Sequence, residues 1–170
     1  MTENATDGIV VGVDGSEASV AALRWAGEQA RALATRVTAV HAWEPATALF
    51  APYAPVSGRP TVEEQRERAA EVLAAAVRTA FGAHRGTGVH AIVAEGRPAR
   101  VLLRHTRGAL LLALGRKAGG PMEPPGIGAV ARECLRHATV PVVTVPALVS
   151  GSTAPSRPVD IHGTVQRGAA

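Results

Sequence analysis

The chain has 170 residues and a formal net charge of +4, with a pI of about 10.5. This length fits one domain, and the single cysteine, Cys134, excludes an intrachain disulfide and with it a secreted, disulfide-stapled scaffold. Aromatic residues make up only 3% of the chain. Its core must therefore consist of Val, Leu, Ile and Ala, which suits helices packed on a parallel sheet.

One interpretation of the net positive charge is that the protein binds nucleic acid. Lys117 is the only lysine, and the arginines are spread through every predicted helix without forming a block. No aromatic residues are interleaved with them in the way that base stacking requires. The sequence therefore does not predict nucleic acid as a primary partner.

We expect no signal peptide and no membrane span. Residues 1–7 are polar, and the longest apolar run, 109–114, has the length of a strand rather than the ~18 residues of a membrane span. We therefore expect a cytoplasmic protein with no membrane partner.

The first predicted elements are a strand and a helix. A continuous apolar run at 9–13 is typical of a strand buried on both faces, and Asp14 and Gly15 end it in a turn. Ser16 is a candidate N-cap for a helix over 17–34, where apolar residues recur at helical spacing.

The middle of the chain repeats this alternation. A second strand is predicted at 37–42, and a loop with four prolines follows at 44–60. The pattern then predicts a charged-faced helix over 61–83, a strand at 89–94 and a short helix over 98–107, whose proline lies in its first turn.

The last elements surround a second loop. An apolar run predicts a strand at 109–114, and a glycine- and proline-rich loop spans 115–128. A helix is predicted from about residue 127 to residue 137, and a valine-rich strand follows at 140–145.

Strands that alternate with helices predict the α/β class: a doubly wound, Rossmann-like, five-stranded parallel sheet with helices on both faces. We expect a flexible N-terminus at 1–7, one domain over 8–146, and a disordered tail at 147–170, which is rich in Gly, Ser, Pro and Arg. Ligands of such sheets bind beyond the carboxyl ends of the strands, where the strand order reverses.

Three segments carry a family resemblance. They are IVVGVDGS at 9–16, GRPA at 96–99, and the strand–loop–helix–strand stretch at 110–146 that contains PVVTV. In this order and spacing they resemble the universal stress protein family over residues 7–146. The resemblance implies strand order 3-2-1-4-5, as in adenine nucleotide alpha hydrolase-like folds, and a cleft between the first and fourth strands.

Nucleotide-binding members of that family carry a loop of the form G-x2-G-x9-G-[S/T], whose glycines let backbone N–H groups approach phosphates. Gly115 and Gly128 match this loop, but Ala118 replaces the second glycine and Ala129 replaces the hydroxyl residue. The resemblance therefore implies an ATP site, with Mg²⁺ accompanying the nucleotide, whose affinity is weakened by roughly ten- to a thousand-fold.

Other residues complete the implied site. Arg116 and Lys117 could meet phosphates, and Ala42 falls where the family lays adenine against the second strand. Asp14 either contacts the ribose or a metal, or only orders the turn before the first helix. The candidate cofactor-binding residues are Gly12, Asp14, Ala42, Gly115, Arg116, Lys117, Gly128, Ala129 and Val130.

Several other patterns do not predict catalysis or metal binding. His41 and Glu44 have no further convergent ligands, Cys134 falls on an apolar helix face, and Ser16 lacks a nucleophile elbow. Residues 126–131 match a dinucleotide pattern, but they do not directly follow a strand. We expect no enzyme, and at most slow ATP hydrolysis.

The last strand lies at an edge of the implied sheet, with valines at Val140, Val142, Val143 and Val145. The family dimerises through this strand, so the resemblance implies a homodimer, with other protein partners left open. Two functional hypotheses follow. The chain is either a stress-response regulator that binds ATP weakly, or a nucleotide-independent dimeric stress protein that acts by binding protein partners.

Overall fold

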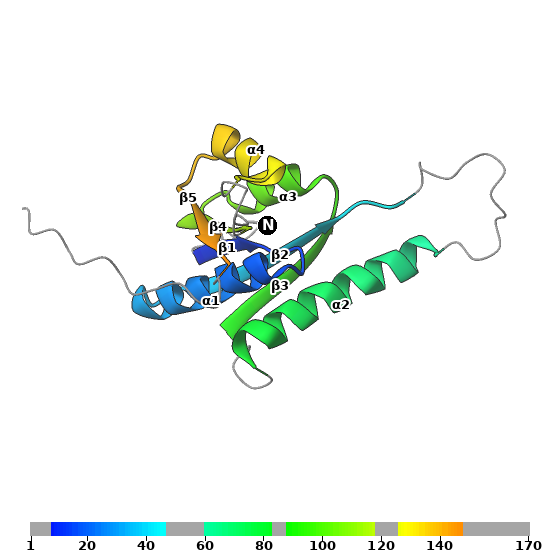
Figure 1. Cartoon of the computed structure of the whole chain (residues 1–170), viewed down its shortest axis with the longest axis horizontal. Helices are drawn as coiled ribbons and strands as arrows, with labels where there is room; N and C mark the ends of the chain where they lie inside the picture. The colour runs from blue at the N-terminus through cyan, green and yellow to red at the C-terminus, as the bar shows by residue number, and fades with distance from the viewer. Residues whose placement is uncertain (1–7, 47–59, 83–87, 118–125, 148–170) are drawn as a thin grey trace, which may run out of the picture.

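The computed structural model describes residues 8–46, 60–82, 88–117 and 126–147. It contains one parallel five-stranded sheet of order β3-β2-β1-β4-β5, which confirms the doubly wound α/β prediction (Figure 1). The predicted N-terminal segment 1–7, the loop residues 47–59, Ala118 and the tail from 148 onward lie outside the described residues. The elements are β1 (Gly8–Gly12), α1 (Glu17–Ala32), β2 (Arg36–Trp43), α2 (Val62–Phe81), β3 (Val89–Glu95), α3 (Pro98–His105), β4 (Leu111–Arg116), α4 (Ala129–His137) and β5 (Val142–Pro146).

Helices cover both faces of the sheet. Successive side chains of a strand point to opposite faces, so each strand contributes residues to both cores. Along β1, Ile9 and Val11 pack with α1 and α2, whereas Val10 packs with α3 and α4 (Figure 1). All three side chains are fully buried. The two cores are aliphatic, as the low aromatic content predicts, and they leave the carboxyl ends of the strands open.

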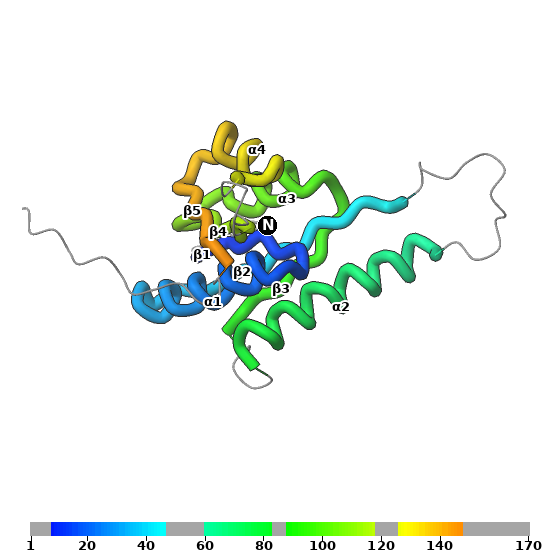
Figure 2. The backbone as a smooth tube through the Cα atoms, viewed as in Figure 1, coloured from blue at the N-terminus to red at the C-terminus, as the bar shows by residue number. Residues whose placement is uncertain are grey.

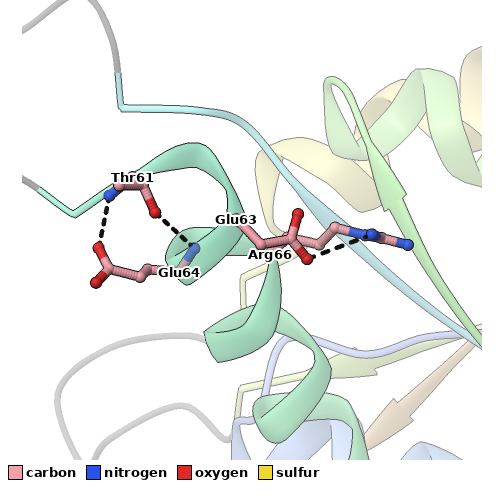
Figure 3. Close-up of polar contacts among 4 residues, drawn as sticks. All are labelled: Thr61, Glu63, Glu64 and Arg66. Atoms are coloured by element: carbon pink, nitrogen blue, oxygen red, sulfur yellow. Dashed lines mark hydrogen bonds and ion pairs between the residues drawn. The ribbon is translucent and has the colours of Figure 1, made fainter.

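The start of α2 is fixed by a reciprocal cap (Figure 3). The Thr61 hydroxyl accepts a hydrogen bond from the Glu64 N–H at 3.1 Å, and the Glu64 carboxylate accepts one from the Thr61 N–H at 2.6 Å. The chain leaving β2 is tied to the same end of α2, since the Ala46 N–H donates to Gln65 Oε1 at 2.7 Å (Figure 2).

Two strands begin later than the apolar pattern predicts. The predicted strand at 109–114 lies at Leu111–Arg116, because the Ala109 N–H still closes a turn onto the Thr106 carbonyl at 3.0 Å. The edge strand predicted at 140–145 lies at Val142–Pro146, where pairing with β4 begins. Hydrophobicity marks a buried segment, whereas pairing with the neighbouring strand decides where the strand starts.

The helix over Ala129–His137 buries the one cysteine of the chain. Cys134 is fully buried in the core beneath α3 and α4, as a small apolar residue would be. Burial, with a smaller contribution from the Glu133 charge, raises the pKa of its thiol to about 11. No helix in the described ranges is both long enough and apolar enough to cross a lipid bilayer.

We predict that a thiol-specific disulfide reagent at pH 8 leaves Cys134 of the native protein essentially unlabelled. With a pKa of about 11, about 0.1% of this thiol is ionised at pH 8, against about a quarter of an ordinary cysteine. The check is the labelling rate in buffer and in denaturant, where one thiol per chain should react promptly. Rapid labelling without denaturant would contradict the buried position.

Candidate functional site

A cleft of about 370 Å³ lies at the carboxyl ends of the strands, where the strand order reverses between β1 and β4. Its walls come from the ends of β1, β2 and β4 and from the N-terminal turns of α1, α3 and α4. The lining residues are Gly12, Val13, Asp14, Ser16, Ala18, Ser19, Val40, Ala42, Pro98, Leu102, Leu114, Gly115, Lys117, Gly126, Gly128, Ala129, Val130 and Ala131.

The structure brings eight of the nine predicted site residues to this cleft. They are Gly12, Asp14, Ala42, Gly115, Lys117, Gly128, Ala129 and Val130. Arg116 does not line it. This residue is the last of β4 and lies opposite Pro146 of β5.

Asp14 is built into the turn that starts α1. Its Oδ1 accepts a hydrogen bond from the Ser16 N–H at 3.0 Å and another from the Ser16 hydroxyl at 2.5 Å. The Ser16 hydroxyl in turn accepts from the Ser19 N–H at 3.2 Å, which caps the helix as predicted. Gly15 lies between them at φ +82°, a left-handed conformation that suits glycine.

The same hydrogen bonds set the ionisation of Asp14. Burial raises the pKa of this carboxyl, but the hydroxyl and N–H of Ser16 and the hydroxyl of Ser19 together outweigh burial and lower the pKa below 3.8. Asp14 is therefore a carboxylate at neutral pH. It orders the turn and also lines the cleft.

The opposite wall is the N-terminus of α4. Gly128 is the N-cap and supplies no side-chain hydrogen bond to the helix. The first turn, Ala129 to Ala131, therefore has no side-chain acceptor from its cap and presents N–H groups beside the cleft. A Cβ atom at Gly126 or Gly128 would meet no atom of the described residues within 4 Å. Packing against these residues thus does not require glycine at either position.

Gly115 has a different reason to be glycine. It lies inside β4 rather than in the predicted loop, and a Cβ there would collide with the Ala18 carbonyl and lie 2.6 Å from the Ser19 backbone nitrogen. Gly115 therefore allows β4 to approach the first turn of α1. Gly12 is similar, because a Cβ there would lie 2.6 Å from a Leu114 methyl group.

His41 forms a hydrogen bond with the backbone just after β1, at the edge of the cleft. Its Nδ1 donates to the Val13 carbonyl at 2.7 Å, and the Val13 N–H donates to the Val40 carbonyl at 2.9 Å. This contact supports the structural interpretation of His41. Within the described residues no three His, Cys, Asp or Glu side chains gather closely enough to hold a metal ion.

Sequence reasoning missed part of the wall. Ser19, Val40 and Leu102 line the cleft without belonging to any motif. Their positions follow only from the register of the sheet and the packing of α1 and α3. The dismissed dinucleotide pattern at 126–131 carried a usable signal, because its two glycines and first helical turn do lie at the cleft.

We predict that Gly115→Ala lowers the free energy of unfolding by about 1–3 kcal/mol, since backbone atoms rather than a mobile side chain occupy the space. Chemical denaturation measures the change. Gly126→Ala is the matched control, which should stay within about 0.5 kcal/mol of the original because its Cβ meets no described residue. Equal stabilities for the two variants would contradict the close contact of β4 with α1.

Comparisons with known proteins all point to one protein family. A family model described as the universal stress protein family matches residues 6–146. A universal stress protein from Mycolicibacterium smegmatis is 30% identical over 150 residues, which cover 85% of this chain and 50% of the relative. The chain thus spans about half the length of the curated relatives that it matches.

Solved structures share the fold. A universal stress protein from Archaeoglobus fulgidus is 25% identical, with a TM-score of 0.61, over 81% of this chain and 97% of that one. A structure from the same organism, described as a universal stress protein in complex with dAMP, is 24% identical, with a TM-score of 0.56, over 81% of this chain and 96% of that one.

Proposed function

Because the chain belongs to the universal stress protein family, we propose that it is a stress-response regulator whose cleft binds an adenine nucleotide, ATP in the first instance. The proposal depends on one observation above all. The N-terminal turn of α4, free of any capping side chain, faces a cleft that Lys117 also lines.

The phosphates would be held at the α4 wall. Helix N-termini favour anions through their exposed N–H groups and the helix dipole, and Lys117 adds a full positive charge. Gly126 and Gly128 leave room for phosphate oxygens to approach the backbone, because no neighbour in the described part of the chain fills the space that a Cβ would take. These residues fit a phosphate chain.

The nucleoside would occupy the rest of the cleft. The carboxylate of Asp14 would repel phosphates but can accept hydrogen bonds from ribose hydroxyls or bind the Mg²⁺ that accompanies ATP. The aliphatic side chains of Val40, Leu102 and Leu114 offer an apolar surface to adenine beside Ala42. The dAMP found in the Archaeoglobus fulgidus structure is an adenine nucleotide of this kind.

We propose that binding is weak and hydrolysis, if present, slow. Ala129 stands at the first position of α4 without the hydroxyl that the family loop places there. A hydrogen bond to a charged group contributes about 1.5–3 kcal/mol. Among the described residues, Asp14 is the one acidic residue that lines the cleft, and its lowered pKa makes it a poor general base.

We predict that Ala129→Ser tightens Mg-ATP binding by about ten- to a hundred-fold, because it restores one hydroxyl at the phosphate wall. Calorimetric titration measures both proteins. Ala74→Ser, on the exposed face of α2, is the control and should leave the affinity unchanged. If neither the original protein nor Ala129→Ser releases heat up to millimolar nucleotide, the nucleotide function is wrong.

A nucleotide-independent dimeric protein that acts through protein partners is the second candidate. It is favoured by Ala129 in the phosphate wall and by the exposed edge of β5, which pairs only with β4 among the described strands. The Pro141 carbonyl and the Ala147 N–H bond to β4. By alternation, the N–H of Thr144 points away from β4, toward any partner strand.

We predict a homodimer that pairs through β5 and is weakened by Thr144→Pro. The substitution removes one outward N–H while sparing the bonds to β4. Sedimentation equilibrium measures the dimer, and Thr144→Ala is the control that retains the backbone donor. If the original protein is still a monomer at a concentration of roughly 100 µM, which corresponds to a dimer weaker than about 5–6 kcal/mol, the proposed dimer is wrong.

A further inference from the structure

Charge is unevenly divided between the two helical layers. The helices α1 and α2 carry six glutamates and five arginines, a net charge of −1. The helices α3 and α4 with their flanking residues carry six arginines and one glutamate, Glu133, a net charge of +5. This division cannot be seen in the sequence, because arginines occur in the helices of both layers.

The six arginines form one surface. Buried residues of α3 and α4 face the sheet, and the two helices pack against each other on the same side of it (Figure 1). Every one of the six arginines is exposed, on the opposite side of its helix. This arginine face consists of Arg97, Arg100, Arg104, Arg107, Arg132 and Arg136.

Glu133 is the one acidic residue of α3 and α4, and within the described residues no ion pair joins it to an arginine of this face. In the part of the chain that the structure describes, the single ion pair joins Arg66 to Glu63 on α2, at 3.6 Å (Figure 3). From the N-cap of α3 onward the arginines Arg97, Arg100 and Arg104 recur every three or four residues, so they form a line that rises by about 10 Å along the helix. Such a line suits a ligand with regularly repeated negative charges.

We propose that the arginine face binds the phosphate backbone of a nucleic-acid duplex without reading its sequence. Binding to phosphates proceeds by release of counterions and needs no apolar centre. A protein partner or a membrane usually takes aromatic or apolar anchors. Neither α3 nor α4 contains an aromatic residue, and Leu135 is the one exposed large apolar side chain on them.

The lack of aromatic residues also selects the form of the nucleic acid. Single strands are held by stacking of their bases on aromatic rings, which the arginine face does not offer. A duplex presents only its phosphates to a flat basic surface. If four arginines contact phosphates, the logarithm of the binding constant falls with the logarithm of salt at a slope of about −3.6.

The test is fluorescence anisotropy with a labelled random-sequence DNA duplex of about 24 base pairs, titrated with the full chain between 50 and 200 mM salt. We expect roughly a hundred-fold weakening over this range. Arg100→Gln/Arg104→Gln/Arg132→Gln should reduce the slope to about −1. The matched control, Arg66→Gln/Arg68→Gln/Arg78→Gln, removes the same charge from α2 and should bind like the original. Thermal melting verifies that both variants fold.

Four results would overturn the proposal. They are the absence of duplex binding at 50 mM salt, equal weakening by the two triple variants, tighter binding of the matching single strand, and binding of polyglutamate or anionic phosphatidylserine vesicles in place of the duplex. Loss of duplex binding in the α3–α4 variant alone supports it. The outcome is independent of nucleotide binding in the cleft, since none of the six arginines lines that cleft.

Discussion

The close approach of β4 to the first turn of α1 is the contact on which the rest of the structure depends. Gly115 makes it possible, because any side chain would meet the backbone of Ala18 and Ser19. This contact places the end of β4 beside the turn of Asp14 and fixes the width of the cleft between them. Gly115 matches the first glycine of the family's phosphate-binding loop, but its packing role does not depend on a ligand.

The cleft combines two opposed electrostatic features. Hydrogen bonds from Ser16 and Ser19 keep Asp14 ionised, whereas the α4 N-terminus and Lys117 attract anions. A ligand that carries both hydroxyl groups and an anionic end satisfies the two sides, and a simple anion satisfies only one. The chemistry of the proposed nucleotide therefore matches the polarity of the cleft.

The sequence predicted the fold and much of the site because both depend on local patterns. Alternating strands and helices predicted the sheet, the family motifs predicted its order, and the turn at Asp14 and the loop glycine Gly128 predicted residues on two walls of the cleft. Strand starts and the apolar wall at Leu102 depend on register and helix packing, which no local pattern encodes. Arg116, which the family loop places beside the phosphates, does not line the cleft, and its position at the end of β4 follows from the pairing of β4 with β5.

The most direct test of the account is to map, by NMR, which backbone amides of the labelled protein shift as Mg-ATP is added. The account predicts the largest shifts at Ala129, Val130 and Ala131 of the α4 wall and at Val13 and Asp14 across the cleft, with little change along α2. Shifts that cluster away from the cleft, or no shifts at millimolar nucleotide, would contradict the assignment of this cleft as a nucleotide site.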